Sequence, residues 1–181
     1  IYVVEKVLIT GGAGFIGHMF IKELIENTDY EVISMDRLDY SGNLNRISDM
    51  MKSYNQAYQN RLKVIHHDLK AEINNLVATQ IGDIKHFFHI AASSHVDRAI
   101  EDPMSFVMDN VVATCNALEF SRKLDNLETF VYFSTDEVFG PAKEGVKFKE
   151  WDRYNSTNPY SATKAGGCLL YTSPSPRDSD T

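Results

Sequence analysis

Two residues near the end of the chain are of types that can move a proton together. Tyr160 and Lys164 are four positions apart, so on a helix their side chains lie on one face. A tyrosine hydroxyl is a poor base at its ordinary pKa of about 10, and a nearby ammonium lowers that pKa by favouring the phenolate. We therefore expect Lys164 to tune Tyr160 as a general base, although such pairs are also common on helices by chance.

A second candidate for acid and base chemistry lies in residues 133–140, which read FSTDEVFG. Thr135, Asp136 and Glu137 follow an apolar run that predicts a strand. Ligands bind at the carboxyl ends of parallel strands, so we expect these groups to face a ligand crevice. Two adjacent carboxylates suit paired acid and base work. The alternative interpretation is a strand-end turn with solvated acids.

A glycine-rich turn near the start of the chain has the spacing of a phosphate-binding loop. Residues 10–17 read TGGAGFIG, in which Gly12, Gly14 and Gly17 satisfy G-x-G-x-x-G and Gly11 offers a variant of it. Glycine permits a tight turn, close approach of the backbone to a pyrophosphate and close packing of helix on strand. The helix that follows offers N–H groups and a positive dipole end. The pattern predicts a dinucleotide site, with a purely structural turn as the alternative.

An acidic residue follows this turn where a ribose-binding carboxylate is expected. Asp36 ends a predicted strand 19 residues beyond Gly17, where it can accept hydrogen bonds from the adenosine ribose hydroxyls. Its charge would repel a 2′-phosphate, so NAD is favoured over NADP. Arg37 could offset that preference, but we interpret it as a solvated surface charge.

The elements that must position these groups alternate along the chain as short β-branched runs and longer amphipathic stretches. This alternation predicts right-handed crossovers and a doubly wound parallel sheet of the Rossmann type. We expect the strand order 3-2-1-4-5, with the cofactor crevice above the first and fourth strands. The predicted strands are Lys6–Thr10, Glu31–Asp36, Leu62–His66, His86–Ile90 and Thr129–Ser134, and the predicted helices run from Gly14 to Asn27, from Pro103 to about Leu124 and from Tyr160 onward.

Composition excludes several classes of protein. The 181 residues carry a net charge of −7, with 43% hydrophobic and 24% charged residues, as in a soluble α/β domain. No basic stripe is available for nucleic acid, no apolar run reaches the roughly 18 residues that span a membrane, and the histidines lack metal-ligand spacing. Cys115 and Cys168 are too few for a disulfide scaffold and favour a reducing cytoplasm.

Five runs of the sequence, taken together, resemble one family. TGGAGFIG, DRLDYSGN, HIAASSHVDRAI, FSTDEVFG and NPYSATKAG are similar, in order and spacing, to the dTDP-glucose 4,6-dehydratases and their UDP-glucose relatives in the extended short-chain dehydrogenase/reductase superfamily. The resemblance covers Val7 to Gly166. FSTDEVFG is its most specific part, because sugar epimerases and decarboxylases of the superfamily usually lack the Asp-Glu pair.

The resemblance implies an NAD-dependent lyase that converts dTDP-glucose or UDP-glucose into the 4-keto-6-deoxy sugar. Tyr160, tuned by Lys164, would take the proton of the C4 hydroxyl while hydride passes from C4 to NAD, and Thr135 would hydrogen-bond that hydroxyl. Glu137 would then remove the C5 proton, and Asp136 would protonate the departing C6 hydroxyl. Hydride would return to C6, so NAD is not consumed.

The resemblance also implies binding residues and a partner. The family forms homodimers through the helices that begin near Pro103 and Tyr160. Two positions depart from its pattern: Ser93 stands where the family usually has Glu or Gln, and Asp39 where it has a small or neutral residue. The implied cofactor contacts are Gly11, Gly14, Phe15, Ile16, Gly17, Asp36, Asp68, Leu69, Ala91, Ala92, Tyr160 and Lys164, and the implied substrate contacts are Ser94, His95 and Thr135.

The end of the sequence breaks the α/β pattern. Residues 168–178 read CLLYTSPSPRD, which resembles the translation of a sequencing-library adapter, with a natural Ser/Pro-rich loop as the alternative. We expect residues 1–167 to be an NAD-binding domain that is incomplete at its C-terminus, and residues 168–181 to be a poorly packed non-native tail. On this interpretation the truncated chain is inactive, and the nucleotide of its parent's substrate cannot be read from it.

Two other functions stay open at this stage. One is a sugar epimerase or decarboxylase on the same scaffold, against which Asp136 and Glu137 argue. The other is a non-catalytic NAD-binding module, against which the joint presence of Thr135, Tyr160 and Lys164 argues.

Overall fold

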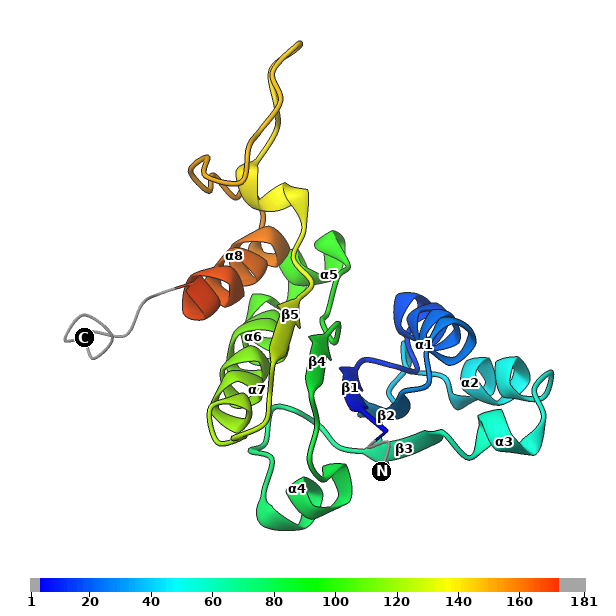
Figure 1. The fold of residues 1–181 in the computed structure, drawn as a ribbon. Coiled ribbons are helices and arrows are strands. Elements are labelled where there is room, and N and C mark those ends of the chain that lie inside the picture. The colour runs from blue at the N-terminus through cyan, green and yellow to red at the C-terminus, as the bar shows by residue number, and fades with distance from the viewer. Residues whose placement is uncertain (1–3, 173–181) are drawn as a thin grey trace. The chain divides into compact units, whose positions relative to one another are not determined.

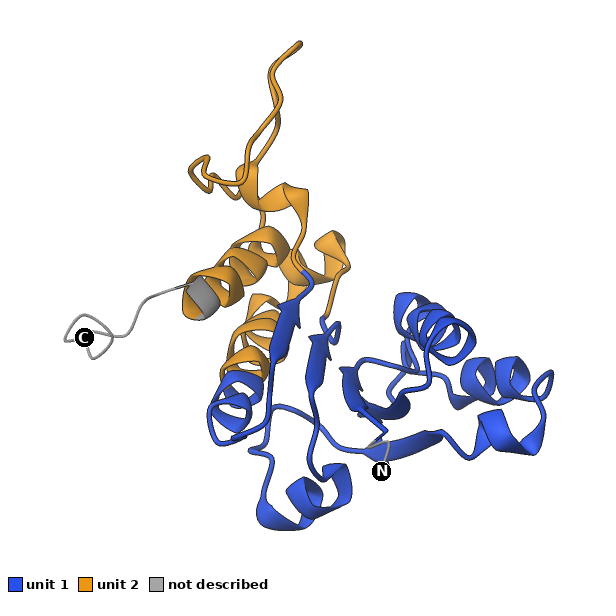
Figure 2. Cartoon of the chain, viewed as in Figure 1, with its two compact units in different colours: residues 1–92, 116–133 blue, residues 93–115, 134–181 orange. Residues whose placement is uncertain are grey.

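A computed structural model describes residues 4–172 of the chain. The chain divides into two compact units, which Figure 2 distinguishes by colour. The first unit comprises residues 1–92 and 116–133, and the second comprises residues 93–115 and 134–181.

A parallel sheet forms the centre of the first unit (Figure 1). Its spatial order is β3-β2-β1-β4-β5, which confirms the predicted order. Val7 pairs with Val32 on one side and His86 on the other, and all four pairings are parallel. The strands are β1 (Lys6–Thr10), β2 (Glu31–Asp36), β3 (Leu62–His66), β4 (His86–His89) and β5 (Thr129–Tyr132).

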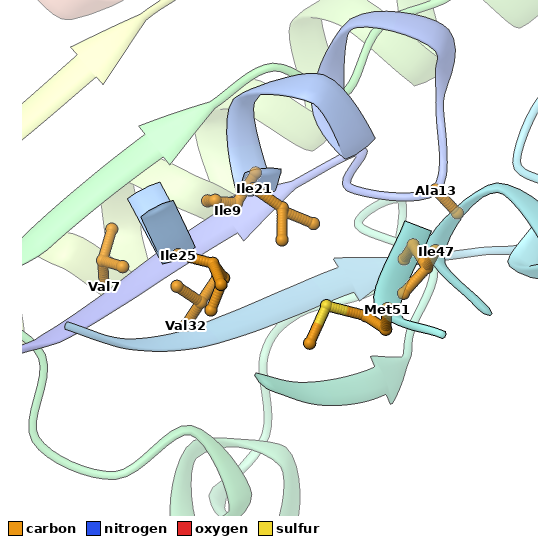
Figure 3. Close-up of a cluster of buried hydrophobic side chains, with 8 residues drawn as sticks. All are labelled: Val7, Ile9, Ala13, Ile21, Ile25, Val32, Ile47 and Met51. Carbon is orange, nitrogen blue, oxygen red and sulfur yellow. The ribbon is translucent and has the colours of Figure 1, made fainter. Parts of the chain in front are cut away.

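Side chains alternate between the two faces of the sheet along each strand, so apolar side chains lie on both faces. Helices bury them on each side. On one face, Ile21 and Ile25, one turn apart on α1 (Phe15–Asn27), pack with Val7 and Ile9 of β1 (Figure 3). α2 (Leu44–Met51) completes this cluster. On the other face, the ring of Phe87 meets that of Phe120, with centroids 6.5 Å apart. The unit also contains the short helices α3 (Gln56–Gln59) and α4 (Asn75–Ile81) and the end of α7 (Ala113–Ser121).

The second unit is built from helices and a long loop (Figure 2). α8 packs against α5, α6 and the π turn η1. The predicted helix from Pro103 to Leu124 is interrupted by this π turn and ends at Ser121, so that prediction is wrong in detail. The elements are α5 (Val96–Glu101), α6 (Pro103–Val107), η1 (Met108–Val112), the start of α7, the 3-10 turn η2 (Asp136–Phe139) and α8 (Pro159–Thr172).

The helix α8 continues through Cys168 to Thr172, and Cys168 is only 7% exposed. The predicted irregular segment beginning at Cys168 is therefore wrong for residues 168–172. The two leucines that follow Cys168 are strong helix formers, and no proline occurs between Tyr160 and Ser173 to end the helix. Residues 173–181 of the predicted tail lie outside the described residues.

Candidate functional site

The glycine turn joins β1 to α1 and leaves no room for a Cβ at Gly11 or Gly17. Gly11 has φ of 74°, and a Cβ on it would lie 2.8 Å from the backbone N and Cα of Ala91. A Cβ on Gly17 would overlap the carbonyl oxygen of Gly11. Gly14 is the N-cap of α1 and supplies no side-chain hydrogen bond to its first turn. Because first-turn N–H groups bind phosphate, the turn fits the pyrophosphate of a dinucleotide.

Phe15 and Ile16 follow in this first helical turn, and their side chains are exposed by 78% and 60%. Their implied contact with a cofactor would therefore be made by backbone N–H groups rather than by buried side chains.

Asp36 connects the end of β2 to the glycine turn. One carboxylate oxygen accepts a hydrogen bond from the N–H of Ala13 at 3.0 Å, and the other accepts from the N–H of Leu38 at 2.8 Å. A carboxylate has about four acceptor positions, so each oxygen can still accept from a ribose hydroxyl. The side chain is 9% exposed and fixed in place, which suits recognition of a ribose.

Four further predicted cofactor residues lie just beyond the ends of β3 and β4. Asp68 forms an ion pair with Lys70 at 3.2 Å, and Leu69 is buried. Ala91 donates its N–H to the hydroxyl of Thr10 at 3.3 Å, so β4 is tied to the strand that leads into the glycine turn. Ala92 is exposed. The structure thus brings Ala91 together with Gly11 within the first unit.

In the second unit, Thr135, Glu137 and Tyr160 form one cluster. The hydroxyl of Thr135 lies near enough to Tyr160 to lower its pKa, and it accepts from the N–H of Glu137 at 3.3 Å. Asp136 follows Thr135 on η2, and the two side chains are 3.4 Å apart. The predicted acid and base residues are therefore neighbours of the predicted tyrosine.

The pKa of Tyr160 lies above its ordinary value. Burial raises the pKa, the hydroxyl of Thr135 lowers it, and the charges of Glu137 and Asp136 raise it again. Within the chain alone, burial and these two carboxylates outweigh the other influences, and the predicted lowering by Lys164 beside a bound cofactor stays a prediction. A positively charged ligand group beside the phenol would act in the opposite direction.

Lys164 is 3% exposed, and burial lowers its pKa to about 8. Water cannot solvate an ammonium at this position, so the neutral amine is favoured relative to an exposed lysine. Lys164 can thus exchange a proton near neutral pH.

Asn158 is a site residue that sequence reasoning missed. Its Nδ2 donates to Glu137 at 3.0 Å, and its Oδ1 accepts from the N–H of Ser161 at 2.8 Å. It therefore joins the carboxylate of Glu137 to the first turn of α8. The signal was its place two residues before Tyr160, where Ser, Thr, Asp and Asn commonly cap a helix.

A buried polar network supports α8 from the π turn. Asn110 is 1% exposed, accepts from the N–H of Ser93 at 2.8 Å, and donates to the carbonyl of Ser93 and to the hydroxyl of Thr163, both at 2.9 Å. The hydroxyl of Ser93 donates to Asp109 at 2.6 Å. π turns occur often at functional sites, and this one holds the helix that carries Tyr160 and Lys164.

The predicted substrate residues Ser94 and His95 are exposed at the start of α5. Within residues 4–172, no hydrogen bond joins either side chain to Thr135, Tyr160 or Glu137, although α5 packs against α8. Their contact with a substrate stays a prediction.

The described part of the chain lacks both a metal-binding group and a membrane-spanning helix. Residues 4–172 contain no group of three or more His, Cys, Asp or Glu side chains that could hold a metal ion. In the same residues, every helix is too short or too polar to cross a membrane.

Known proteins resemble this chain in sequence and in structure. The sequence model described as GDP-mannose 4,6 dehydratase matches residues 8–173. The chain is 38% identical over 179 residues to dTDP-glucose 4,6-dehydratase of Salmonella typhimurium, covering 88% of this chain and 47% of that protein. The chain therefore spans about half the length of the curated relatives it matches.

Solved structures agree. The dTDP-glucose 4,6-dehydratase DesIV of Streptomyces venezuelae, solved with NAD bound, superimposes with a TM-score of 0.80 at 32% identity over 91% of this chain and 50% of that one. A UDP-Glc/GlcNAc 4-epimerase of Campylobacter jejuni gives 0.79 at 26% identity over 92% and 47%. These matches confirm the predicted Rossmann-type fold and the family resemblance. The chain belongs to the GDP-mannose 4,6 dehydratase family.

Proposed function

We propose that the chain is the NAD-binding part of a nucleotide-sugar 4,6-dehydratase acting on dTDP-glucose or UDP-glucose. The observation that carries this proposal is the cluster of Thr135, Glu137 and Tyr160, with Asp136 beside it. Oxidation at C4 needs one base, which Tyr160 supplies. Loss of water across C5 and C6 needs a further base and acid, and the adjacent carboxyl groups of Asp136 and Glu137 can supply both.

In this proposal each residue has one task. Tyr160 accepts the proton of the C4 hydroxyl, Thr135 holds that hydroxyl, and Lys164 supports the phenolate. Glu137 removes the C5 proton, which the neighbouring ketone makes acidic, and Asp136 gives a proton to the departing C6 hydroxyl. When bound, NAD supplies a reversible hydride acceptor. The glycine turn would hold its pyrophosphate, Asp36 its adenosine ribose, and Asp68 and Leu69 its adenine.

The test is conversion of dTDP-glucose and UDP-glucose by a version of the protein extended to the length of its relatives. The expected product is the 4-keto-6-deoxy sugar. Glu137→Gln should keep the oxidation but stop the elimination, so the absorbance of the reduced cofactor accumulates. Glu144→Gln, at an exposed acid outside the cluster, is the matched control. A product epimerised at C4 would favour the epimerase alternative instead.

We also propose that the 181 residues alone bind NAD but do not turn substrate over. The relatives are about twice as long, and a displacement of about 1 Å in a bound substrate can cost about a hundredfold in rate. Turnover by the 181-residue chain at the rate of the extended protein would contradict this.

We propose a cytoplasmic homodimer for the extended protein. Exposed apolar side chains on α6 and η1 support dimerisation: Met104, Val107 and Met108. Sedimentation of the extended protein tests it, and a monomer at micromolar concentration would contradict it.

A further inference from the structure

The turn that follows β2 carries two aspartates with an arginine between them in sequence. Asp36, at the end of the strand, has both carboxylate oxygens bound to backbone N–H groups. Arg37, the next residue, donates its Nε–H to Asp39 at 2.6 Å. The side chains of this ion pair are 27% and 25% exposed, so solvent screens them only in part. Arg37 is therefore held by Asp39, contrary to the expectation of a solvated surface charge.

Asp39 is itself fixed by the turn. The oxygen that faces away from Arg37 accepts from the N–H and the hydroxyl of Ser41, at 2.9 and 2.7 Å, and lies 3.3 Å from the N–H of Gly42. Leu38, between the two charged residues, has φ of 58°, which turns the chain sharply. Burial alone would raise the pKa of Asp39, but the hydrogen bonds of Ser41 and the charge of Arg37 outweigh it and keep the pKa below its usual value. The ion pair is thus built into the turn.

This arrangement bears on the choice between NAD and NADP, which differ by a phosphate at the 2′-hydroxyl of the adenosine ribose. An acid at the end of the second strand favours NAD, whereas an arginine nearby accommodates the 2′-phosphate. The sequence offers both residue types side by side. Other charged groups near the turn are Arg46, which donates to the carbonyls of Ala13 and Ser41, and His66, whose ring bonds the carbonyl of Arg37.

We infer that Asp39 determines cofactor specificity by holding the guanidinium of Arg37, so that it does not offset the preference that Asp36 gives for NAD. The inference rests on the proposed binding of NAD by this chain. It assigns to Asp39 a role in positioning another residue rather than a contact with the cofactor.

The variant Asp39→Asn separates the two functions of this side chain. Its amide oxygen can still accept from Ser41 and Gly42, while its NH2 group replaces the oxygen that faces Arg37. The turn should therefore persist and the ion pair should be lost. Asp49→Asn removes one negative charge from a different ion pair, with Lys52 at 2.7 Å, and is the matched control.

The experiment is calorimetric titration of the 181-residue chain with NAD and with NADP. Asp39→Asn should bind NADP about tenfold more tightly, as expected for one charge-assisted contact with phosphate, and NAD within twofold of the unaltered chain. The gain should shrink with added salt and should vanish in the double variant Arg37→Met with Asp39→Asn.

Three outcomes would overturn the inference: no gain for NADP, an equal gain in Asp49→Asn, or a gain that survives loss of Arg37. The last would mean that Asp39 acts through its own charge. If the unaltered chain binds neither dinucleotide, the proposed cofactor function fails instead, so the two failures are distinguishable.

Discussion

The proposed sites in the two units of the chain differ in which parts of the polypeptide they would present to a ligand. In the first unit the binding groups are mainly backbone atoms of the glycine turn, and side chains such as Asp36 hold that backbone in place. In the second unit the reactive groups are side chains, and the residues that hold them are other side chains, such as Asn158 and Asn110.

This difference teaches how each site can be damaged. A backbone site tolerates changes of side chain but not the addition of a Cβ where the chain passes close to itself. A side-chain site depends on single functional groups and on buried polar partners, whose loss leaves unsatisfied hydrogen-bonding groups. Four predictions test the contrast, beginning with the largest expected effect.

Tyr160→Phe removes one hydroxyl from the side-chain site. In the extended protein we expect kcat to fall by about a thousandfold, in the range of general-base catalysis, with NAD binding retained. The measurement is sugar conversion together with calorimetric titration of NAD. Tyr58→Phe, at a partly exposed tyrosine of the first unit, should change neither. A fall of less than tenfold in Tyr160→Phe would remove the central base from the proposed mechanism.

Asn110→Ala removes three hydrogen bonds from the buried network of the second unit. The free energy of unfolding should fall by about 3 kcal/mol, because the backbone of Ser93 is left without these partners. Urea unfolding measures this loss. Asn126→Ala, at an exposed asparagine that bonds Asp83 at 2.9 Å, is the control and should cost less than about 1 kcal/mol. Equal losses would show that the buried network contributes no more to the free energy of unfolding than one exposed hydrogen bond does.

Gly11→Ala and Gly82→Ala compare two glycines with the same φ of 74°. Both alanines meet backbone strain at positive φ, and at Gly82, where ψ is −159°, this strain is about 1–3 kcal/mol. A Cβ at Gly82 has nothing within 4 Å, whereas one at Gly11 meets the backbone of Ala91. Gly11→Ala should therefore cost about 2 kcal/mol more in unfolding free energy and should also weaken NAD binding. Equal losses of unfolding free energy in the two variants would mean that the backbone of Ala91 can shift to accommodate a Cβ at Gly11.

Lys164→Met should stabilise the second unit at pH 7 by up to about 2 kcal/mol, since an ammonium is no longer desolvated. The folded pKa of about 8 lies below the ordinary 10.5. The unfolded chain therefore binds more protons between these values, and the stability of the unaltered chain should rise with pH across that window. Unfolding at pH 7 and pH 10 should show the advantage of Lys164→Met disappearing. Lys52→Met, at an exposed lysine, should leave the pH dependence unchanged.

The sheet and the glycine turn of the first unit could be predicted from the sequence, whereas the helices α2, α3 and α4 were not predicted. β-branched runs gave all five strands, and the spacing of Gly11, Gly14 and Gly17 gave the turn, because these signals depend on residues close in sequence. The order of the strands is the one expected for a Rossmann-type sheet.

The second unit could be predicted only in its reactive residues. The network of Asn110 joins residues 17 and 53 positions away, and no local pattern indicates such contacts. The rise in the pKa of Tyr160 could not be predicted for the same reason, because the burial of this side chain and its nearness to Glu137 and Asp136 arise from the folded structure. The spacing of Tyr160 and Lys164 indicated only one group that can affect this pKa, and it did not indicate burial, Thr135 or the two carboxylates.

The π turn at Met108–Val112 makes the number of residues in this helix a constraint in its own right. A π turn accommodates an additional residue within a helix, so deletion of one residue there would restore an ordinary α-helix without breaking the chain. It would also rotate the residues on one side relative to the other by about 100°. Asn110 would then no longer face both Ser93 and Thr163. Related sequences should therefore differ in this segment by substitutions and not by deletions. A relative that lacks one residue here should hold the helix that carries Tyr160 in another way.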